Sequence, residues 1–155
     1  MKVRDIMKHE VVTCPLDSSL ADAARLMWDR DLGALPVVDP YGRAIGMITD
    51  RDICMAALHS GVDLKHRGVI VAMSKGVYSC HPDSSVEVAE EIMQRCQIRR
   101  LPVIDGNDVL AGIVTLADIA SHARALEEPA ANAAGVVRTI AGIVERRWKG
   151  ALAQP

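Results

Sequence analysis

The chain has 155 residues, half of them hydrophobic and a quarter charged, and a formal net charge of −2 at pH 7, which is typical of a soluble globular protein and argues against a general nucleic-acid binder. No run of about 18 uncharged apolar residues predicts a membrane span, and the N-terminus MKVRDIMKHE has charges where a signal peptide needs its apolar segment. We therefore expect a cytoplasmic protein without membrane or nucleic-acid partners, whose four cysteines are reduced thiols.

An internal repeat organises the sequence. Residues 7–53 align without a gap with residues 73–119 at an offset of 66, and 16 of the 47 aligned positions are identical. Such a repeat fixes the architecture. Because each copy is near the size at which a core alone is marginal, the copies are expected to share one core. The predicted organisation is repeat 1 (3–59), a linker (60–68), repeat 2 (69–124) and a tail (125–155).

Both copies predict the same order of elements, β-α-β-β-α, which is an α/β (α+β) fold. Short extended pieces are expected at 11–13 and 77–79. Helices capped by Ser18 and Ser84 follow, the second with a capping box to Glu87. Their apolar stripes are Leu20, Ala23, Ala24 and Met27, and Val86, Ala89 and Met93. Strands are predicted at 35–39 and 44–49, and at 101–105 and 110–115, with helices beginning near Asp50 and Leu116.

The tail carries a third periodic segment. Val136 or Val137, Ile140, Val144 and Trp148 form an apolar stripe that predicts an amphipathic helix at about 135–149. We expect this helix to pack on its own domain or on a dimer mate. The alternative is a helix that recruits a protein partner.

The motifs GMITDRD and GIVTLAD lie where a strand is expected to lead into a helix. Gly46 and Gly112 allow close approach of backbone. Thr49 sits at the end of its strand, and Asp52 in the first helical turn can accept hydrogen bonds from the two hydroxyls of a ribose. Arg51 adds a cation for phosphate. The structural alternative is that Thr and Asp are ordinary helix caps.

These paired units, with LPVVD…GMITDRDI and RRLPVID…GIVTLADI, resemble a tandem pair of CBS domains, the Bateman module, over about residues 3–120. The resemblance implies two repeats packed about a pseudo-twofold axis, with two clefts that bind AMP, ADP, ATP, NAD or S-adenosylmethionine. It also implies a homodimer that forms a flat disc through its helices. The expected function is a stand-alone sensor, not an enzyme, that changes an unknown partner interaction when its regulatory adenine nucleotide binds; no catalytic cofactor is expected.

The resemblance also assigns site residues. Ribose falls to Asp52 and Asp118, and the hydroxyl position to Thr49 and Thr115. The base falls to Val12 and Thr13 or to Tyr78 and Ser79, beside the Leu-Pro-Val strands. The full set of expected ligand-binding residues is Val12, Thr13, Pro36, Val37, Gly46, Thr49, Arg51, Asp52, Tyr78, Ser79, Arg99, Arg100, Pro102, Val103, Gly112, Thr115 and Asp118.

The two copies differ in their cations. Copy 1 has Arg51 but Gly33 and Ala34 before its Leu-Pro-Val, whereas copy 2 has Arg99 and Arg100 there. The cations are thus divided between the copies, and we expect one strong ligand site and one weak or empty site.

Two alternatives stay open. Cys14 and Cys80 are equivalent positions and His81 adjoins Cys80, so a metal or redox-responsive site with these residues, and with His9, is conceivable, although no CxxC or HxxxH spacing supports it. The other alternative is a scaffold protein with vestigial clefts. Cys54 and Cys96 are expected to pack within helices, and His59, His66 and His122 to be surface residues.

Overall fold

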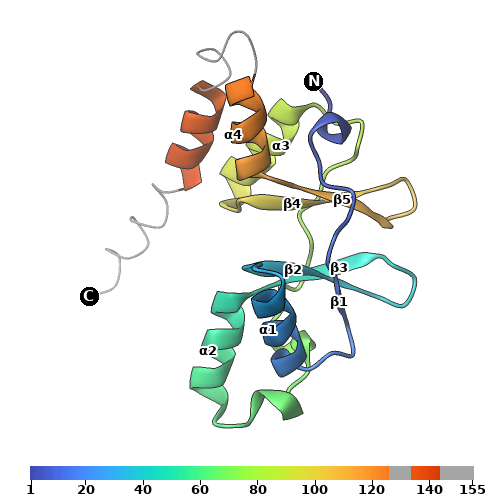
Figure 1. The fold of residues 1–155 in the computed structure, drawn as a ribbon, viewed down its shortest axis with the longest axis vertical. Helices are drawn as coiled ribbons and strands as arrows, with labels where there is room; N and C mark the ends of the chain where they lie inside the picture. Colours follow the sequence, from blue (N-terminus) through green and yellow to red (C-terminus); the bar gives the residue numbers. More distant parts are fainter. Residues whose placement is uncertain (126–133, 144–155) are drawn as a thin grey trace. The chain divides into compact units, whose positions relative to one another are not determined.

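The computed structural model describes residues 1–125 and 134–143, which form two compact units (Figure 1). The first-repeat unit contains residues 11–77 together with 107–110. The second-repeat unit contains residues 1–10, 78–106 and the described residues from 111 on. The mixed α+β class predicted from the repeat is confirmed. Among the described residues, no helix has both the length and the apolar character that a bilayer crossing requires.

The first-repeat unit is a small sheet with two helices on one face (Figure 1). The central strand β2 pairs in parallel with β1 and antiparallel with β3, so that Val37 lies opposite both Cys14 and Gly46. The elements are β1 (Cys14–Pro15), α1 (Leu20–Asp29), β2 (Ala34–Val38), β3 (Ala44–Thr49), α2 (Asp50–Ser60) and the 3-10 turns η2 (Leu64–His66) and η3 (Val69–Val71). The core between sheet and helices is aliphatic, built from Leu20, Ala23, Met27, Leu35, Val37, Ile48, Ile53 and Val69.

The second-repeat unit has the same plan with a reduced sheet. Its elements are η1 (Val3–Asp5), α3 (Val86–Cys96), β4 (Arg100–Ile104), β5 (Leu110–Thr115), α4 (Leu116–Ala125) and a further helix at 134–143. The strand equivalent to β1 shrinks to a single parallel bridge between Cys80 and Val103. Its core includes Val86, Ala89, Met93, Leu101, Val103, Val114 and Ile119.

Each unit is completed by a segment from the other copy of the repeat. In the second-repeat unit, Val3 N–H donates to the Ser84 carbonyl at 2.9 Å, and Lys8 and Ile113 exchange two backbone hydrogen bonds of 2.9 Å. In the first-repeat unit, Val69 N–H donates to the Ser18 carbonyl at 2.9 Å. Val3 and Val69, which are equivalent by the offset of 66, are both fully buried in these cores. The compact units therefore cut across the sequence repeats.

The helix caps lie one residue later than the sequence predicted. Ser19 caps α1 in a box with Asp22, and Ser85 caps α3 by accepting from Val88 N–H. The prediction of Ser18 and Ser84 as caps was therefore wrong. The extended pieces expected at 11–13 and 77–79 are also displaced, because the residues that pair with the sheet are 14–15 and 80. By contrast, strands 44–49 and 110–115 have the bounds that the sequence predicted.

The predicted linker and the tail helix both pack on a unit. Within residues 60–68, Leu64 packs on the first-repeat core and the Arg67 carbonyl accepts from Leu20 N–H at 2.7 Å. In the tail, the helix at 134–143 buries Val136, Thr139 and Ile143. Of the predicted stripe, Val136 is buried, whereas Val137 and Ile140 are 63% and 45% exposed. Val144 and Trp148 lie outside the described residues.

Candidate functional site

The Thr–Asp pair forms the same closed capping box in both units. Thr49 N–H and Oγ1–H donate to Asp52 Oδ2 at 2.9 and 2.6 Å, and Asp52 N–H donates to Thr49 Oγ1 at 3.2 Å. In the other unit, Asp118 Oδ2 accepts from Thr115 N–H and Oγ1–H at 2.9 and 2.5 Å. One oxygen of each carboxylate is thus held by the cap, which fixes the direction of the other oxygen. The capping and ribose-binding interpretations are therefore compatible, because they use different oxygens.

The second carboxylate oxygen distinguishes the two units. Lys8 Nζ lies 3.5 Å from Asp118 Oδ1, and the Asp118 side chain is only 14% exposed. The offset of 66 places Ser74 at the equivalent position in the first-repeat unit, where its hydroxyl accepts from Met47 N–H at 3.0 Å and donates to the Gly76 carbonyl at 2.7 Å. In the part of the chain that the structure describes, Asp52 Oδ1 therefore has no cation beside it.

The glycines of the two motifs make the same close backbone approach. A Cβ on Gly46 would lie 2.8 Å from the Ser74 carbonyl oxygen, and a Cβ on Gly112 would lie 2.8 Å from the Lys8 carbonyl oxygen. Real Cβ atoms essentially never come that close to backbone oxygen. Gly46 thus lets the segment at Ser74 pack against β3, and Gly112 lets the segment at Lys8 pack against β5, which places Lys8 near Asp118.

A pocket of about 340 Å³ opens beside Asp52 in the first-repeat unit. Its apolar wall comes from α2 and η3, and its polar groups are Asp52, His59 and Arg67. The Nε of Arg67 is buried and has no hydrogen-bond partner. An unpaired buried donor is costly, so this nitrogen lacks a hydrogen bond that buried donors normally make. The lining residues are Asp52, Met55, Ala56, His59, Arg67, Val71 and Ala72.

Of these pocket residues, sequence reasoning found only Asp52. His59 was assigned to the surface, and it is indeed exposed, yet it also lines the pocket. A signal existed in the helical spacing, since residues 52, 56 and 59 follow i, i+4, i+7 and so share one face of α2. Arg67 had no local signal, because it falls in the expected linker.

The expected basic residues are divided between the two units. Arg51 is exposed in the first turn of α2. The Arg99 carbonyl accepts from Leu116 N–H at 2.9 Å, which places Arg99 at the start of α4. Lys8, Arg99 and Arg100 thus belong to the same unit as Asp118. The structure adds Arg67 to the unit that contains Arg51, and Lys8 to the unit that contains Arg99 and Arg100.

The residues expected beside the base have varied environments. Val12, Thr13 and Ser79 are half-buried, and Tyr78 is 58% exposed. The strand residues of the two Leu-Pro-Val segments lie in the cores, with their side chains closed to solvent: Pro36, Val37, Pro102 and Val103.

The two equivalent cysteines are buried thiols. Burial raises the pKa of Cys80 to about 11 and also raises the pKa of Cys14. His81 is exposed, and its backbone N–H donates to Ser84 Oγ at 3.2 Å. Across residues 1–125 and 134–143, no three His, Cys, Asp or Glu side chains come together as a metal site.

Known proteins share both the sequence and this fold. Residues 3–59 and 67–125 each match the CBS domain family. The CBS domain-containing protein YhcV of Bacillus subtilis is 41% identical over 118 residues, which cover 76% of this chain and 82% of YhcV. Hypoxic response protein 1 of Mycobacterium tuberculosis is 37% identical over 119 residues, 77% of this chain and 82% of that protein.

Solved structures agree with the sequence relatives. The CBS domain pair of protein MJ0100, in complex with 5'-methylthioadenosine and S-adenosyl-L-methionine, is 28% identical and matches 79% of this chain and 94% of its own, with a TM-score of 0.71. Hypoxic Response Protein I with two coordinated zinc ions is 36% identical, matches 79% and 98% of the two chains, and has a TM-score of 0.72. Family, repeat and fold coincide, and the chain belongs to the CBS domain family as a tandem pair, which is a regulatory fold.

Proposed function

We propose that the chain is a regulatory module that binds an adenosine-containing ligand beside Asp52, and that binding alters an interaction with a protein partner. The observation that carries this proposal is the pocket lined by Asp52, whose Oδ1 no described cation contacts, and by Arg67, whose buried Nε has no hydrogen-bond partner. A carboxylate can accept hydrogen bonds from both hydroxyls of a ribose. The complex of the MJ0100 pair with methylthioadenosine and S-adenosylmethionine supports this ligand class.

The ligand groups are assigned by the polarity of the pocket. Because Asp52 Oδ2 is held by Thr49, its Oδ1 is preorganised to receive the ribose hydroxyls. Arg67 would donate to an anionic group on the same ligand, either the phosphate of a nucleotide or the carboxylate of S-adenosylmethionine. The apolar side chains of Val71, Ala72 and Ala56 would contact the less polar part of the ligand.

The site beside Asp118 is proposed as the weaker of two. Lys8 already lies near Asp118 Oδ1, so the hydroxyls of a ribose would compete with an ammonium group for the same oxygen. An ion pair with one exposed partner contributes little stability, about 0–1 kcal/mol, and so it weakens the second site without closing it. The stoichiometry expected is one tight ligand and one weak ligand per chain.

Titration calorimetry with S-adenosylmethionine, methylthioadenosine, AMP and ATP tests these assignments on the full chain. Asp52→Asn keeps a capping oxygen but removes the charge, and it should weaken the tight site about 10- to 100-fold. Asp118→Asn is the matched control, because it makes the same change in the same cap and should leave the tight site unchanged. Arg67→Met should weaken charged ligands and leave methylthioadenosine unaffected. Equal losses from Asp52→Asn and Asp118→Asn would contradict the assignment.

A zinc-binding role is the second candidate, because Hypoxic Response Protein I carries two coordinated zinc ions and this chain has Cys14, Cys80 and His81. Zinc binds the thiolate, so both buried thiols would have to lose their protons on binding. Elemental analysis of the purified protein tests this role. Stoichiometric zinc that is lost in Cys14→Ser and Cys80→Ser variants would support it, and absence of zinc after exposure to Zn²⁺ would contradict it.

A further inference from the structure

The helix at 134–143 packs on α3 through polar side chains. Gln94 Nε2 donates to Thr139 Oγ1 at 2.9 Å, and Gln97 Nε2 donates to the Gly142 carbonyl at 3.3 Å. Thr139 is fully buried, and its hydroxyl donates in turn to the Gly135 carbonyl at 3.0 Å. The net stability gained from such hydrogen bonds is modest, because water offers the same side chains equivalent partners when the two helices separate.

A third contact completes a regular register between the two helices. A Cβ on Gly135 would lie 3.1 Å from both carboxylate oxygens of Glu90, so this carboxylate lies directly against the backbone of the covering helix. The partners in all three contacts are 45 residues apart, which means that the two helices run parallel. Glu90, Gln94 and Gln97 follow the spacing i, i+4, i+7 of one helix face, which we call the α3 strip.

The apolar part of this contact is small. In the helix at 134–143, the aliphatic side chains of Val136 and Ile143 are buried, whereas Val137 and Ile140 are 63% and 45% exposed. These contacts must offset the conformational entropy that is lost when the helix is ordered on α3. Elements held by few buried apolar contacts open locally at a lower free energy than the core of the same unit. The helix at 134–143 therefore has the features of a separately opening element.

The charge of Glu90 opposes closure of this contact. Burial first, and Glu87 of the same helix second, raise the pKa of Glu90, and Arg138 of the covering helix acts in the opposite direction. A carboxyl whose pKa is raised in the covered state binds its proton more tightly there than in water. The penalty for the charge is present above the raised pKa and disappears as pH falls toward the ordinary value of 4.5. Protonation therefore favours the covered state.

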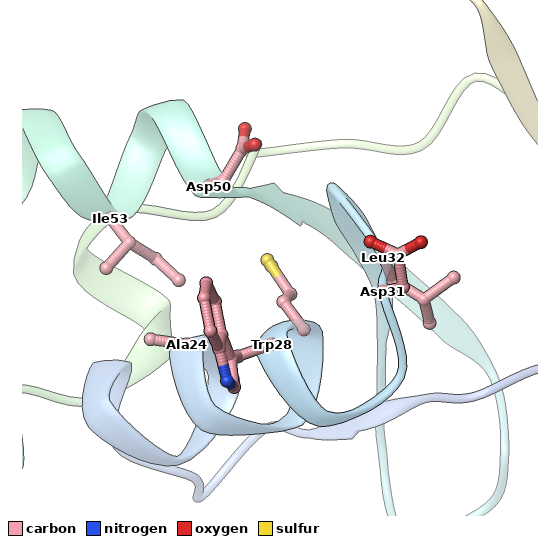
Figure 2. A pocket seen from close by; sticks show the side chains of 7 residues that line it. Ala24, Trp28, Asp31, Leu32, Asp50 and Ile53 are labelled. Carbon is pink, nitrogen blue, oxygen red and sulfur yellow. The ribbon is translucent and has the colours of Figure 1, made fainter.

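The equivalent strip of the first-repeat unit faces solvent. The offset of 66 places Ala24, Trp28 and Asp31 at the positions of the α3 strip. Figure 2 shows these side chains around a pocket of about 250 Å³, and Trp28 is 87% exposed there. The same helix face is thus open in one unit and covered in the other.

We propose that the helix at 134–143 is a removable cover of the α3 strip, which separates from α3 while the rest of the second-repeat unit stays folded and which protonation of Glu90 holds closed. In the open state the three side chains of the strip meet water, as their equivalents on α1 do. The cover then decides whether the chain presents this helix face in one unit or in both. The cover is independent of the ligand proposed for the Asp52 pocket.

Thiol labelling of a Val136→Cys chain tests the cover. Val136 is 8% exposed and belongs to the core of the unit, so a thiol introduced there reacts only while the helix is separated from α3. Native Cys80 is 4% exposed in the same core and reports unfolding of the whole unit, while the exposed Cys54 gives the unprotected rate. In timed labelling with a dipyridyl disulfide, followed by mass spectrometry of peptides, the introduced thiol should react at least about 10-fold faster than Cys80.

Substitutions in this background test the contacts of the strip. Gln94→Ala removes the donor to Thr139 and should raise the rate of the introduced thiol, relative to Cys54, by about 3- to 10-fold. Glu90→Gln removes the opposing charge and should lower the same relative rate at pH 7. A change from pH 7 to pH 5 should lower it in the chain with Glu90 and much less in the Glu90→Gln variant. Glu91→Gln is the matched control, because Glu91 is exposed on the same helix, and it should leave the rate unchanged.

Hydrogen exchange followed by mass spectrometry makes the comparison in the unaltered chain, where amides of residues 134–143 should exchange before those of α3. The proposal is overturned if the introduced thiol reacts together with Cys80 or as fast as Cys54. It is also overturned if residues 134–143 and α3 exchange together, or if Glu90→Gln changes the labelling rate no more than Glu91→Gln does.

Discussion

Substitution of Gly112 by alanine tests the exchange of segments between the repeats. A Cβ at this position would lie 2.8 Å from the Lys8 carbonyl oxygen and 2.9 Å from Met7 Sδ. The methionine can move, but the carbonyl is fixed by two hydrogen bonds of 2.9 Å between Lys8 and Ile113. The N-terminal segment must therefore shift away from β5, and both hydrogen bonds lengthen.

The expected cost follows from those two hydrogen bonds. Each backbone hydrogen bond contributes about 0.5–1.5 kcal/mol net, and displacement of the Met7 side chain adds to this. The free energy of unfolding of Gly112→Ala should fall by about 2–4 kcal/mol. With a urea dependence of roughly 1–3 kcal/mol/M, the midpoint of denaturation should fall by about 1–2 M.

Urea denaturation followed by circular dichroism measures this change. Gly46→Ala should behave alike, because its Cβ would meet the Ser74 carbonyl oxygen at 2.8 Å. Gly106→Ala is the control, since a Cβ there meets no atom within 4 Å. If Gly112→Ala is as stable as Gly106→Ala, residues 1–10 do not pack on the second repeat. Lys8 would then not lie beside Asp118.

Three further outcomes are expected. Lys8→Met should tighten methylthioadenosine binding at the weak site in calorimetry, because an uncharged ligand can only compete with the ammonium group for Asp118; unchanged binding would refute this competition. Cys54 is exposed and should react with iodoacetamide well before Cys80, whose burial raises its pKa to about 11, as mass spectrometry of timed samples would show. Burial first, and Glu87 second, raise the pKa of Glu90, so the penalty for its charge is fully present above that raised pKa and disappears as pH falls toward the ordinary value of 4.5. Glu90→Gln should therefore raise the melting temperature near pH 7 and lessen this difference under acidic conditions.

Local chemistry explains which elements the sequence predicted well. The motif Gly-h-h-Thr-x-x-Asp predicted the junctions of β3 with α2 and of β5 with α4, because the capping box lies within four residues. The caps of α1 and α3 were missed by one residue, since adjacent serines compete for the role and the sequence does not show which one extends toward the third helical N–H. The junctions of β3 with α2 and of β5 with α4 could be predicted because their caps depend only on residues that are close in sequence.

Long-range pairing explains what the sequence did not reveal. Val3 and Val69 have the same character and spacing, so either copy could have supplied either core. The position of Lys8 beside Asp118 was not predicted, because it depends on the N-terminal segment packing on the second repeat. The buried face of the helix at 134–143 includes Thr139, a polar residue that hydrophobic patterning excludes, and Gln94 satisfies its hydroxyl. A stripe chosen from apolar residues alone therefore included Val136 of the buried face but omitted Thr139.

Two of the positions at which the repeats differ distinguish the surfaces of the two units. Thr, Asp and Gly of the motif are shared, and they hold the fold of each unit. Lys8 is equivalent to Ser74 by the offset of 66, and Trp28 is equivalent to Gln94 in the same way. Ser74 and Gln94 make internal hydrogen bonds. Lys8 instead lies beside the Asp118 carboxylate, and the ring of Trp28 is exposed. Two equal sites would give a symmetric module, whereas in the described residues Lys8 lies beside Asp118 and no cation lies beside Asp52, and the exposed Trp28 belongs to the same unit as Asp52.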